Sequence, residues 1–173
     1  MVDPFIDPKS VICRVYAYVA YRIGASPEAE DVTSETFERA LRYRESFDPR
    51  RGDAIAWLIG IARRCIADAA LRRELPIGKV DERAVEGHED DAVRRLELAA
   101  AVAHLDARER ELVALRYGAD LTARQIGELL DMRTNAVEVA LHRALARLRG
   151  LLEEDAREAS ETTELQWTPR PQD

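Results

Sequence analysis

The sequence has few aromatic residues, few glycines and prolines, and no long stretch of uncharged residues. Aromatic residues make up 6% of the 173 residues, and 8 Gly and 7 Pro are too few for a collagen-like or low-complexity chain. The longest run without a charge is far short of the roughly 20 apolar residues that cross a bilayer. The N-terminus MVDPFIDPKS also lacks the basic-then-apolar pattern of a secretory signal. We therefore expect a cytoplasmic protein with no membrane insertion.

Cysteine and histidine are scarce as well, which limits the chemistry that the chain can support. Cys13 and Cys65 both lie among apolar residues at helical spacing, and no CxxC or Cys/His cluster supplies a set of metal ligands. We expect both to be core residues, because free cysteine is among the most buried residue types. The sequence also shows no carboxylate pair, no nucleophile beside a base and no Gly-rich phosphate loop. These absences predict a protein without cofactor, metal or enzymatic activity.

The residues that are abundant favour helices. Ala, Leu, Arg and Glu recur throughout, and they lose little side-chain freedom in a helix. Apolar residues recur at three-and-four spacing within 11–23, 27–43 and 55–73, and again from Val93 onward. The predicted fold is all-α, with two small helical domains joined by a flexible linker and a helix-turn-helix in the second domain.

Composition divides the chain into four parts. Residues 1–74 form the first helical domain, and residues 75–92, with one Pro, two Gly and a cluster of acids, form an acidic linker. Residues 93–152 form the second helical domain. Residues 153–173 are polar and acidic, so we expect a disordered tail unless a partner docks it. Such a linker permits the two domains to be packed together or apart, and the sequence leaves both states open.

Charge is distributed unevenly along the chain. The net charge of −7 argues at first against a nucleic-acid partner, which needs a basic surface. The excess acid, however, lies in residues 75–104 and 151–173, with net charges of −3 and −5. Residues 50–73 hold six arginines against two acids, and residues 140–150 hold three arginines and no acid. Two local basic patches result, for which ordinary solvated helix faces are the alternative interpretation.

Residues 121–148 have the pattern of a helix-turn-helix. Thr122 and Gln125 can form a capping box at the start of its first helix, and the small Gly127 allows the close approach that the motif requires. Asp131 falls where the turn often needs a left-handed residue, a conformation that Asp tolerates better than most residues. Three-and-four spacing in the second helix turns four residues inward: Val137, Leu141, Ala144 and Leu148.

The outward positions of that second helix suit DNA. The N-terminal residues of such a helix meet base edges in the major groove. Asn135 can bridge adenine, Glu138 can accept a hydrogen bond from cytosine, and Val139 can cover a thymine methyl group. The arginines that follow suit phosphates. Helical hairpins in ordinary bundles share this pattern, so this part of the chain alone leaves both interpretations open.

Three segments, taken from both halves of the chain, together indicate a protein family more specifically than either half does alone. They are AEDVTSETFERAL (Ala29 to Leu41), WLIGIARRCIADAALRR (Trp57 to Arg73) and LDARERELVALRYGADLTARQIGELLDMRTNAVEVALHRALARLRGLL (Leu105 to Leu152). In order and spacing, they resemble the two conserved domains of the extracytoplasmic function (ECF) sigma factors of the sigma-70 family, over roughly residues 10–152. The resemblance implies a protein that binds core RNA polymerase and directs it to promoter DNA. Residues 1–74 then correspond to domain 2 and residues 93–152 to domain 4.

The resemblance implies two tasks for domain 2. Its second helix grips the clamp helices of the polymerase, where Asp31, Glu35 and Phe37 fall and where both carboxylates are expected to be exposed. The loop from Ser46 to Asp53 corresponds to the family's specificity loop, which holds a base flipped out of the minus-ten element. Trp57 is expected in the core rather than as a stacking platform. The residues assigned to minus-ten DNA are Phe47, Arg50, Arg51, Arg63, Arg64, Arg72 and Arg73.

Domain 4 of the family reads the minus-thirty-five element through its helix-turn-helix. The residues assigned to this DNA are Arg124, Arg133, Thr134, Asn135, Glu138, Val139, His142 and Arg143. Residues 138–140 (Glu-Val-Ala) stand where the family often has a polar or basic run, which predicts an unusual minus-thirty-five preference. The resemblance also implies that the acidic linker is the family's connector. Because such factors are usually held by an anti-sigma protein, we expect that partner too.

A sigma-factor mimic is the alternative function. Such a protein would bind an anti-sigma protein without reading DNA, and the acidic balance and residues 138–140 favour it. The arginines of residues 57–73 favour DNA binding instead, and the chain has no room for the receiver domain that we expect in a mimic. A stand-alone helix-turn-helix repressor is disfavoured because it would leave residues 10–73 unexplained.

Overall fold

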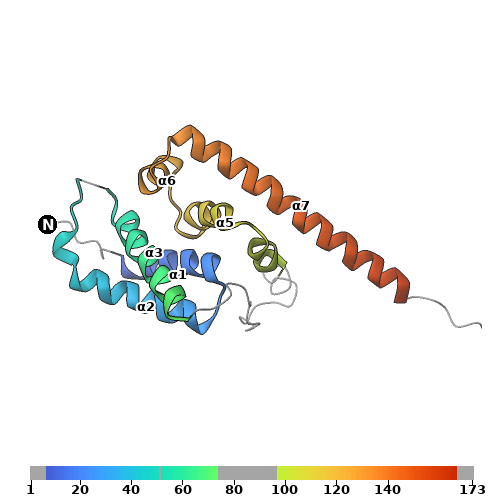
Figure 1. Ribbon diagram of the computed structural model, residues 1–173, viewed down its shortest axis with the longest axis horizontal. Coiled ribbons are helices and arrows are strands. Elements are labelled where there is room, and N and C mark those ends of the chain that lie inside the picture. The colour runs from blue at the N-terminus through green and yellow to red at the C-terminus, as the bar shows by residue number, and fades with distance from the viewer. Residues whose placement is uncertain (1–6, 51, 74–96, 167–173) are drawn as a thin grey trace, which may run out of the picture.

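A computed structural model describes residues 7–50, 52–73 and 97–166, and within these ranges it contains helices and no β-strand. Figure 1 shows two groups of helices that lie against each other, α1 to α3 and the helices from residue 97 onward. The all-α prediction with two helical groups is confirmed. Several sequence predictions lie outside the described residues: those for Arg51, for the linker over 75–92 and for 167–173, together with the side chain of Arg73.

The N-terminal half consists of α1 (Pro8–Ile23), α2 (Pro27–Arg42), a short 3₁₀ helix η1 (Arg44–Ser46) and α3 (Ala54–Arg73). Gly24 ends α1 with a φ of 89°, which favours glycine because it has no Cβ. Ser26 then caps α2 by accepting a hydrogen bond from the backbone N–H of Ala29, and Pro27 takes the first helical position. These local signals set the tight turn between the first two helices.

The C-terminal half contains a helix over 97–103, α5 (Ala107–Val113), a π-helical turn η2 (Ala114–Gly118), α6 (Ala123–Leu130) and α7 (Thr134–Gln166). Asp106 begins α5 and Thr122 begins α6, each in a complete capping box closed by Glu109 and Gln125 respectively. Asp131 ends α6 in the left-handed conformation, with a φ of 54°. The predicted capping box at Thr122 and the predicted left-handed residue are confirmed.

The last helix is longer than the sequence analysis expected. Figure 1 shows α7 running across the C-terminal half and projecting beyond the other helices. The helix continues to Gln166, so the prediction of a disordered tail over 153–173 is wrong for residues 153–166. That stretch contains no Gly or Pro and is rich in good helix formers, so a helix already nucleated in the helix-turn-helix propagates through it.

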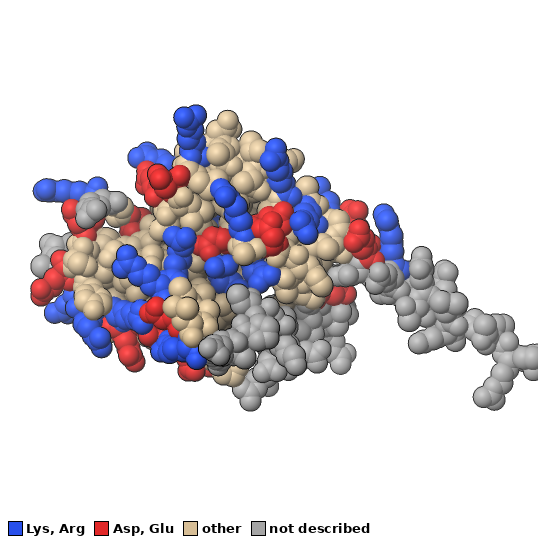
Figure 2. All heavy atoms as spheres, viewed as in Figure 1, with Lys and Arg blue, Asp and Glu red and all other residues tan. Residues whose placement is uncertain are grey.

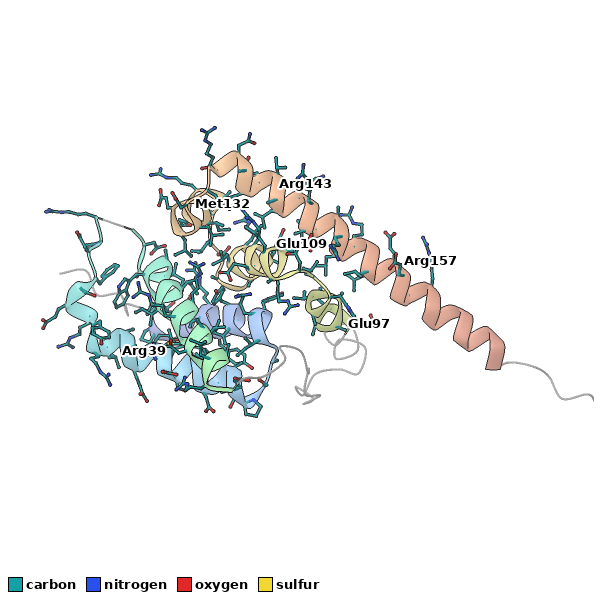
Figure 3. All side chains as sticks on the ribbon, in the orientation of Figure 1. Arg39, Glu97, Glu109, Met132, Arg143 and Arg157 are labelled. Carbon is teal, nitrogen blue, oxygen red and sulfur yellow. The ribbon has the colours of Figure 1, made fainter. Side chains whose placement is uncertain are left out.

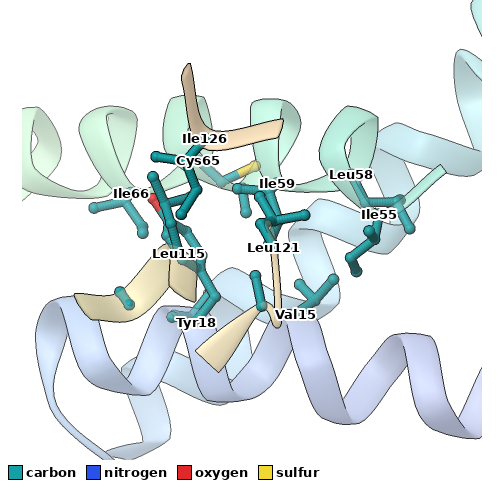
Figure 4. Close-up of a cluster of buried hydrophobic side chains, with 14 of the residues drawn as sticks. Val15, Tyr18, Ile55, Leu58, Ile59, Cys65, Ile66, Leu115, Leu121 and Ile126 are labelled. Carbon is teal, nitrogen blue, oxygen red and sulfur yellow. The ribbon is translucent and has the colours of Figure 1, made fainter. Parts of the chain in front are cut away.

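One apolar core joins the two halves. Tyr18 of α1 and Ile59 of α3 are fully buried in the same cluster as Leu115, Leu121 and Ile126 of the C-terminal half. Figure 4 shows these five side chains in a single cluster. The sequence left open whether the halves are packed together or apart, and the structure has them packed together.

The C-terminal half also has a small core of its own. Its members come from the helix over 97–103, the residues that follow it, α5 and α7. They are Ala101, Val102, Leu105, Val113, Ala144 and Leu148.

The two cysteines have different environments. Cys65 is buried in the large core, as predicted, and burial raises the pKa of its thiol. Cys13 is exposed on α1, so its assignment to the core is wrong. A helix turns about 100° per residue, so two residues place Cys13 about 200° away from the buried Val15. α1 buries only the face that carries Val15.

Candidate nucleic-acid interface

α6 and α7 form the helix-turn-helix that the sequence predicts. A Cβ on Gly127 would lie 2.6 Å from the carbonyl oxygen of Met132, so the turn accepts glycine there and little else. Beneath the motif, Ile126, Val137 and Leu141 are buried. The opposite side of α7 is therefore held toward solvent at a fixed orientation.

All the residues assigned to minus-thirty-five DNA are exposed: Arg124, Arg133, Thr134, Asn135, Glu138, Val139, His142 and Arg143. Val139 is 44% exposed, which leaves an apolar side chain among polar neighbours. An exposed Val beside an exposed Asn provides both a methyl contact and a bidentate amide for base edges. The structure thus presents what the prediction requires of this surface, and contacts with DNA remain a prediction.

Four of these residues, Arg133, Asn135, Val139 and Arg143, line a groove of about 620 Å³ beside α7. Arg108 of α5 lines the opposite wall. The lining residues labelled in Figure 3 are Glu109, Met132 and Arg143. Arg108, Arg133 and Arg143 thus surround the apolar Val139. Arginines in such positions can bind backbone phosphates of DNA while the apolar side chain contacts a base.

Two arginines of the C-terminal half form ion pairs with acidic side chains. Arg124 Nε lies 2.9 Å from Glu128 Oε1, and Arg147 Nη1 lies 3.6 Å from Glu109 Oε2. The arginine of each pair is largely exposed, so each pair contributes little stability and can exchange for a phosphate contact. Figure 2 shows basic and acidic side chains interspersed on the face that it draws, rather than one continuous basic strip.

The residues assigned to minus-ten DNA fall into two groups. Arg50 and Arg64 are exposed, and neither has an ion pair within the described parts of the chain. Arg63 and Arg72 are each paired with a carboxylate. Of these four described arginines, Arg50 and Arg64 can therefore meet a phosphate without first giving up an ion pair.

The two rings at the specificity loop contact each other. The ring centroids of Phe47 and Trp57 lie 5.4 Å apart with an interplanar angle of 49°. Trp57 is half-buried and packs against the large core, in the setting that the sequence analysis expected. Phe47, also half-buried, therefore anchors the loop to α3.

Glu35 is not the exposed carboxylate that the resemblance implied. Its two oxygens lie 2.5 Å from Arg39 Nη2 and 2.9 Å from Arg72 Nη2, and Arg39 also contacts Asp68 at 2.7 Å. Hydrogen bonds from Arg72, and secondly from Arg39, lower the pKa of Glu35. The expectation is wrong because α2 and α3 run antiparallel and the Glu35 side chain faces α3.

The other two residues assigned to polymerase binding differ in exposure. Asp31 is exposed on α2, as expected. Phe37 is half-buried and packs against the large core. Of the three, Asp31 is thus the side chain that α2 presents most openly to a partner.

Glu111 connects the two halves, and the sequence did not predict this role. Only 8% exposed, its carboxylate accepts a 2.9 Å hydrogen bond from the Tyr18 hydroxyl and lies 3.1 Å from Arg63 Nε. Arg22 Nε is 2.6 Å from the other oxygen, in a charge contact without hydrogen-bond alignment. Burial, and secondly the charge of Glu111, raise the pKa of Tyr18 well above its usual range. We refer to these four residues as the Glu111 cluster.

Helical spacing carries the signal that could have identified Glu111. It lies four residues before Leu115 and seven before Gly118, so the three share one stripe of the α5–η2 segment. Leu115 and Gly118 are buried against the N-terminal half. A charged residue on an otherwise apolar stripe indicates a buried partner, although the sequence does not say which residue it is.

Further polar contacts cross the same boundary, among them one from Arg14 Nη2 to the carbonyl oxygen of Asp120 at 3.1 Å. Arg14 Nε donates a 2.9 Å hydrogen bond to the carbonyl oxygen of Ala119. Gln125 Nε2 donates a 3.2 Å hydrogen bond to Asp53 Oδ2, which links α6 to the end of the specificity loop. The two surfaces assigned to DNA are therefore neighbours.

Within the described ranges, no group of three or more His, Cys, Asp or Glu residues could hold a metal ion. Over the same ranges, no helix combines the length and apolar character that crossing a membrane requires.

Both halves of the chain match one family. Residues 12–75 match Sigma-70 region 2, and residues 95–148 match Sigma-70, region 4. The chain is 37% identical over 152 residues to the ECF RNA polymerase sigma factor BldN of Streptomyces coelicolor, a match that covers 83% of this chain and 58% of BldN. It is 35% identical over 141 residues to the ECF RNA polymerase sigma factor ShbA of Streptomyces griseus, covering 72% of each chain.

A solved structure shares the fold across most of the chain. The sigma factor RpoE of Bartonella quintana, in complex with the anti-sigma factor NepR, superposes with a TM-score of 0.72 at 19% identity. The match covers 88% of this chain and 98% of the RpoE chain. At this identity the likeness concerns the fold alone.

Proposed function

The chain belongs to the ECF RNA polymerase sigma factors of the sigma-70 family, and we propose that it binds core RNA polymerase and directs it to a specific set of promoters. One observation carries the proposal: regions 2 and 4 occur in order in one chain, and the second contains a helix-turn-helix with an exposed reading face. In this proposal, the chain acts in the cytoplasm as an initiation factor without catalytic activity of its own.

In this function, the surface of α2 binds the polymerase. Asp31 is exposed and can pair with a basic residue of the clamp helices. Glu35 takes part only by exchanging its intramolecular partners, since Arg39 and Arg72 already occupy both of its oxygens. Phe37 acts by fixing α2 on the core. We therefore propose Asp31 as the main polymerase contact among the three residues.

Promoter DNA binds on both halves. Arg50 and Arg64 contact the minus-ten element, where exposed arginines attract the single strand and Phe47 stays close to Trp57. On α7, the exposed face over 133–143 reads the minus-thirty-five element in the major groove.

We also propose an anti-sigma partner. RpoE of Bartonella quintana, which shares the fold, was solved in complex with the anti-sigma factor NepR. A partner that covers both halves would shield the polymerase-binding and DNA-reading surfaces together.

Promoter-directed transcription with three single variants tests the proposal. Arg64→Ala removes a phosphate contact and should weaken promoter complexes on all sequences alike, with a smaller salt dependence. Asn135→Ala should instead relax discrimination at one minus-thirty-five position, by about 5- to 150-fold for one bidentate contact. Arg157→Ala is the matched control, because Arg157 is exposed on the projecting part of α7 (Figure 3).

The same assay separates the sigma-factor mimic from the proposal. A mimic would bind an anti-sigma protein and start no transcription with core polymerase, and Arg64→Ala and Asn135→Ala would then change nothing. Loss of promoter selectivity in Asn135→Ala, with core binding unchanged, supports a DNA-reading factor.

A further inference from the structure

The corner between α2 and the specificity loop carries an exposed aromatic ring. Tyr43, which ends α2 four residues before Phe47, is 56% exposed, the largest exposed fraction among the aromatic residues that the structure describes. Phe47 and Trp57 are half-buried, and their rings contact each other. Trp57 also packs against the large core, in which Tyr43 takes no part. Of the three rings next to the loop, that of Tyr43 is therefore the one that the fold leaves open to a ligand.

The backbone at Tyr43 is held on both sides. Its N–H donates a 3.0 Å hydrogen bond to the carbonyl oxygen of Arg39, in the last turn of α2. Its carbonyl oxygen accepts hydrogen bonds from the backbone N–H of Ser46 at 2.8 Å and from the Ser46 hydroxyl at 2.7 Å. Because the backbone is fixed and a tyrosine side chain has only two rotatable angles, a ligand on this ring costs little conformational entropy.

Arginines flank Tyr43 in the sequence. Residues 42–50 contain three arginines and two acids. Arg42 and Arg44 are the direct neighbours of Tyr43, both are exposed, and neither forms an ion pair within the described parts of the chain. One of the two acids, Asp48, accepts a 3.0 Å hydrogen bond from the backbone N–H of Arg50. The two arginines next to the ring are therefore available to an anion.

An exposed ring between two cations suits single-stranded DNA. Unpaired bases stack on aromatic side chains, and basic residues beside the ring bind the backbone phosphates. In a duplex, neighbouring base pairs cover both faces of each base, so such a ring can stack only on a base that has left the duplex. Figure 1 shows α2 leading directly into the loop that connects it to α3, which is the loop assigned to the opened minus-ten element.

We propose that Tyr43 is a stacking platform for an unpaired base of the minus-ten strand, beside the base that the specificity loop holds, and that Arg42 and Arg44 bind the flanking phosphates. This inference rests on the proposed function. Tyr43 supplies the stacking surface that Trp57 cannot, because Trp57 packs against the core and Phe47. Since the contact requires an unpaired base, Tyr43 stabilises the opened promoter and contributes nothing to binding of closed duplex DNA.

Binding of preopened promoter DNA to the assembled holoenzyme measures the stacking contact. The probe is a promoter fragment that the chain transcribes, with its minus-ten element made non-complementary so that this strand is already unpaired. Tyr43→Ala should weaken binding by about 5- to 150-fold, the range for one stacked base. Tyr43→Phe keeps the ring and should bind as the parent does. Equal losses in Tyr43→Phe and Tyr43→Ala would assign the effect to the hydroxyl group and overturn the proposal.

Tyr117→Ala is the matched control, because Tyr117 is 51% exposed on η2 and lies among no residues assigned to DNA. It should bind the preopened fragment as the parent does. The affinity of each variant for core polymerase is measured separately and should be unchanged, and circular dichroism verifies that each variant is folded. If Tyr43→Ala weakens core binding, and the assembled holoenzyme keeps its affinity for the preopened fragment, then Tyr43 contacts the polymerase and the proposal is wrong.

Salt dependence tests the two flanking arginines. Arg42→Gln and Arg44→Gln should each lower the slope of log affinity against log salt concentration by about 0.7, the value for one phosphate contact on a single strand. Tyr43→Ala should leave this slope unchanged, because stacking on a ring releases no counterions. Unchanged slopes in both arginine variants would contradict the proposed phosphate contacts.

Photo-crosslinking gives a readout that needs no promoter. A single-stranded oligonucleotide that carries 5-iodouracil is irradiated with the full chain, both free and with core polymerase, and mass spectrometry identifies the crosslinked residue. Tyr43 should be the crosslinked tyrosine, and Tyr117 should not react. No crosslink at Tyr43 in either sample, or equal yields at the two tyrosines, would overturn the proposal.

The two readouts together separate this inference from the proposed function. If Tyr43 crosslinks but the chain starts transcription on no fragment, the proposed function fails and Tyr43 remains a site for single-stranded DNA. If the chain directs transcription and Tyr43→Ala holoenzyme binds preopened DNA as the parent does, the function stands and the role of Tyr43 is rejected.

Discussion

The two halves of the chain use their apolar residues differently. The N-terminal half directs its buried side chains into one core, formed where α1, α2 and α3 meet. The C-terminal half divides its own between that core, through Leu115, Leu121 and Ile126, and a separate small core that includes Val102 and Leu105. The buried side chains of the N-terminal half thus belong to the large core alone. Those of the C-terminal half are divided between this large core, which the two halves share, and a small core within the C-terminal half.

The two best-paired carboxylates repeat this contrast. Glu35 is held by two arginines within the N-terminal half, near the surface. Glu111 is held by Arg22 and Arg63 across the boundary and is buried. The ion pairs of Glu35 therefore connect two helices of the N-terminal half, whereas those of Glu111 connect the two halves to each other.

Leucine truncation should show the largest difference between the two cores. Leu58→Ala in the large core should lower the free energy of unfolding by about 2–5 kcal/mol, toward the upper end because the site is fully enclosed. Leu105→Ala should fall toward the lower end, since the cluster that surrounds Leu105 is the smaller of the two. Urea unfolding measures both. Equal losses of unfolding free energy in the two variants would contradict the expected difference between the two cores.

Two glycine substitutions in the N-terminal half should have the next largest effects. Gly24→Ala in the N-terminal half forces a side chain into a φ of 89° and should destabilise by about 1–3 kcal/mol. Gly60→Ala, in the middle of α3 and facing open space, should stabilise by about 0.5–1 kcal/mol instead. Thermal unfolding of the pair measures the sign. The same sign for both variants would contradict the backbone argument.

Removing a capping box should have a moderate effect in the C-terminal half. Thr122→Ala deletes the side chain that accepts from the Gln125 N–H and should destabilise by about 1 kcal/mol. Asp106→Ala, in the second capping box, is the comparison and should give a similar loss. Chemical denaturation of the two variants tests this. No measurable loss in either would show that packing alone starts these helices.

A substitution of Glu35 should have a smaller effect than any of these. Because its pKa is lowered from the ordinary 4.5 in the folded chain, its ionised form adds stability above the unfolded pKa, and this stability is lost as pH falls through the folded pKa. Glu35→Gln should therefore reduce stability at pH 7 by less than about 1 kcal/mol, because the partners are partly exposed. The difference should shrink in acid and vanish once the pH is below the lowered pKa of the folded chain.

Glu128→Gln is the control, since Glu128 forms a similar pair with Arg124 at an exposed site. Its effect should be smaller than that of Glu35→Gln at neutral pH. A loss for Glu35→Gln that persists unchanged in acid would show that packing, and not charge, is what the substitution removes.

Local structure could be read from the sequence because it depends on neighbours in the chain. The capping box at Thr122, the cap at Ser26 and the left-handed Asp131 all follow from side chains within three or four residues. The length of α7 differs from the sequence prediction because an acidic composition does not by itself prevent a helix. The helix depends on the helix propensity of these residues and on the helical nucleus that precedes them.

Long-range pairing could not be read in the same way. That Glu35 faces Arg72, and Glu111 faces Arg63, depends on how helices far apart in sequence are placed. Helical spacing shows that a residue lies on a given stripe, but two apolar stripes can meet in several ways. The exposed face of α7 that we assign to DNA could be predicted from the sequence because the motif that presents it is local.

Transcription from a genomic fragment library, with core RNA polymerase and with or without this chain, is the experiment that decides the proposed function. We expect a discrete set of start sites that appear only when the chain is present and that share elements at minus-ten and minus-thirty-five. Demonstrable binding to core polymerase with no new start site on any fragment would contradict a promoter-directing function.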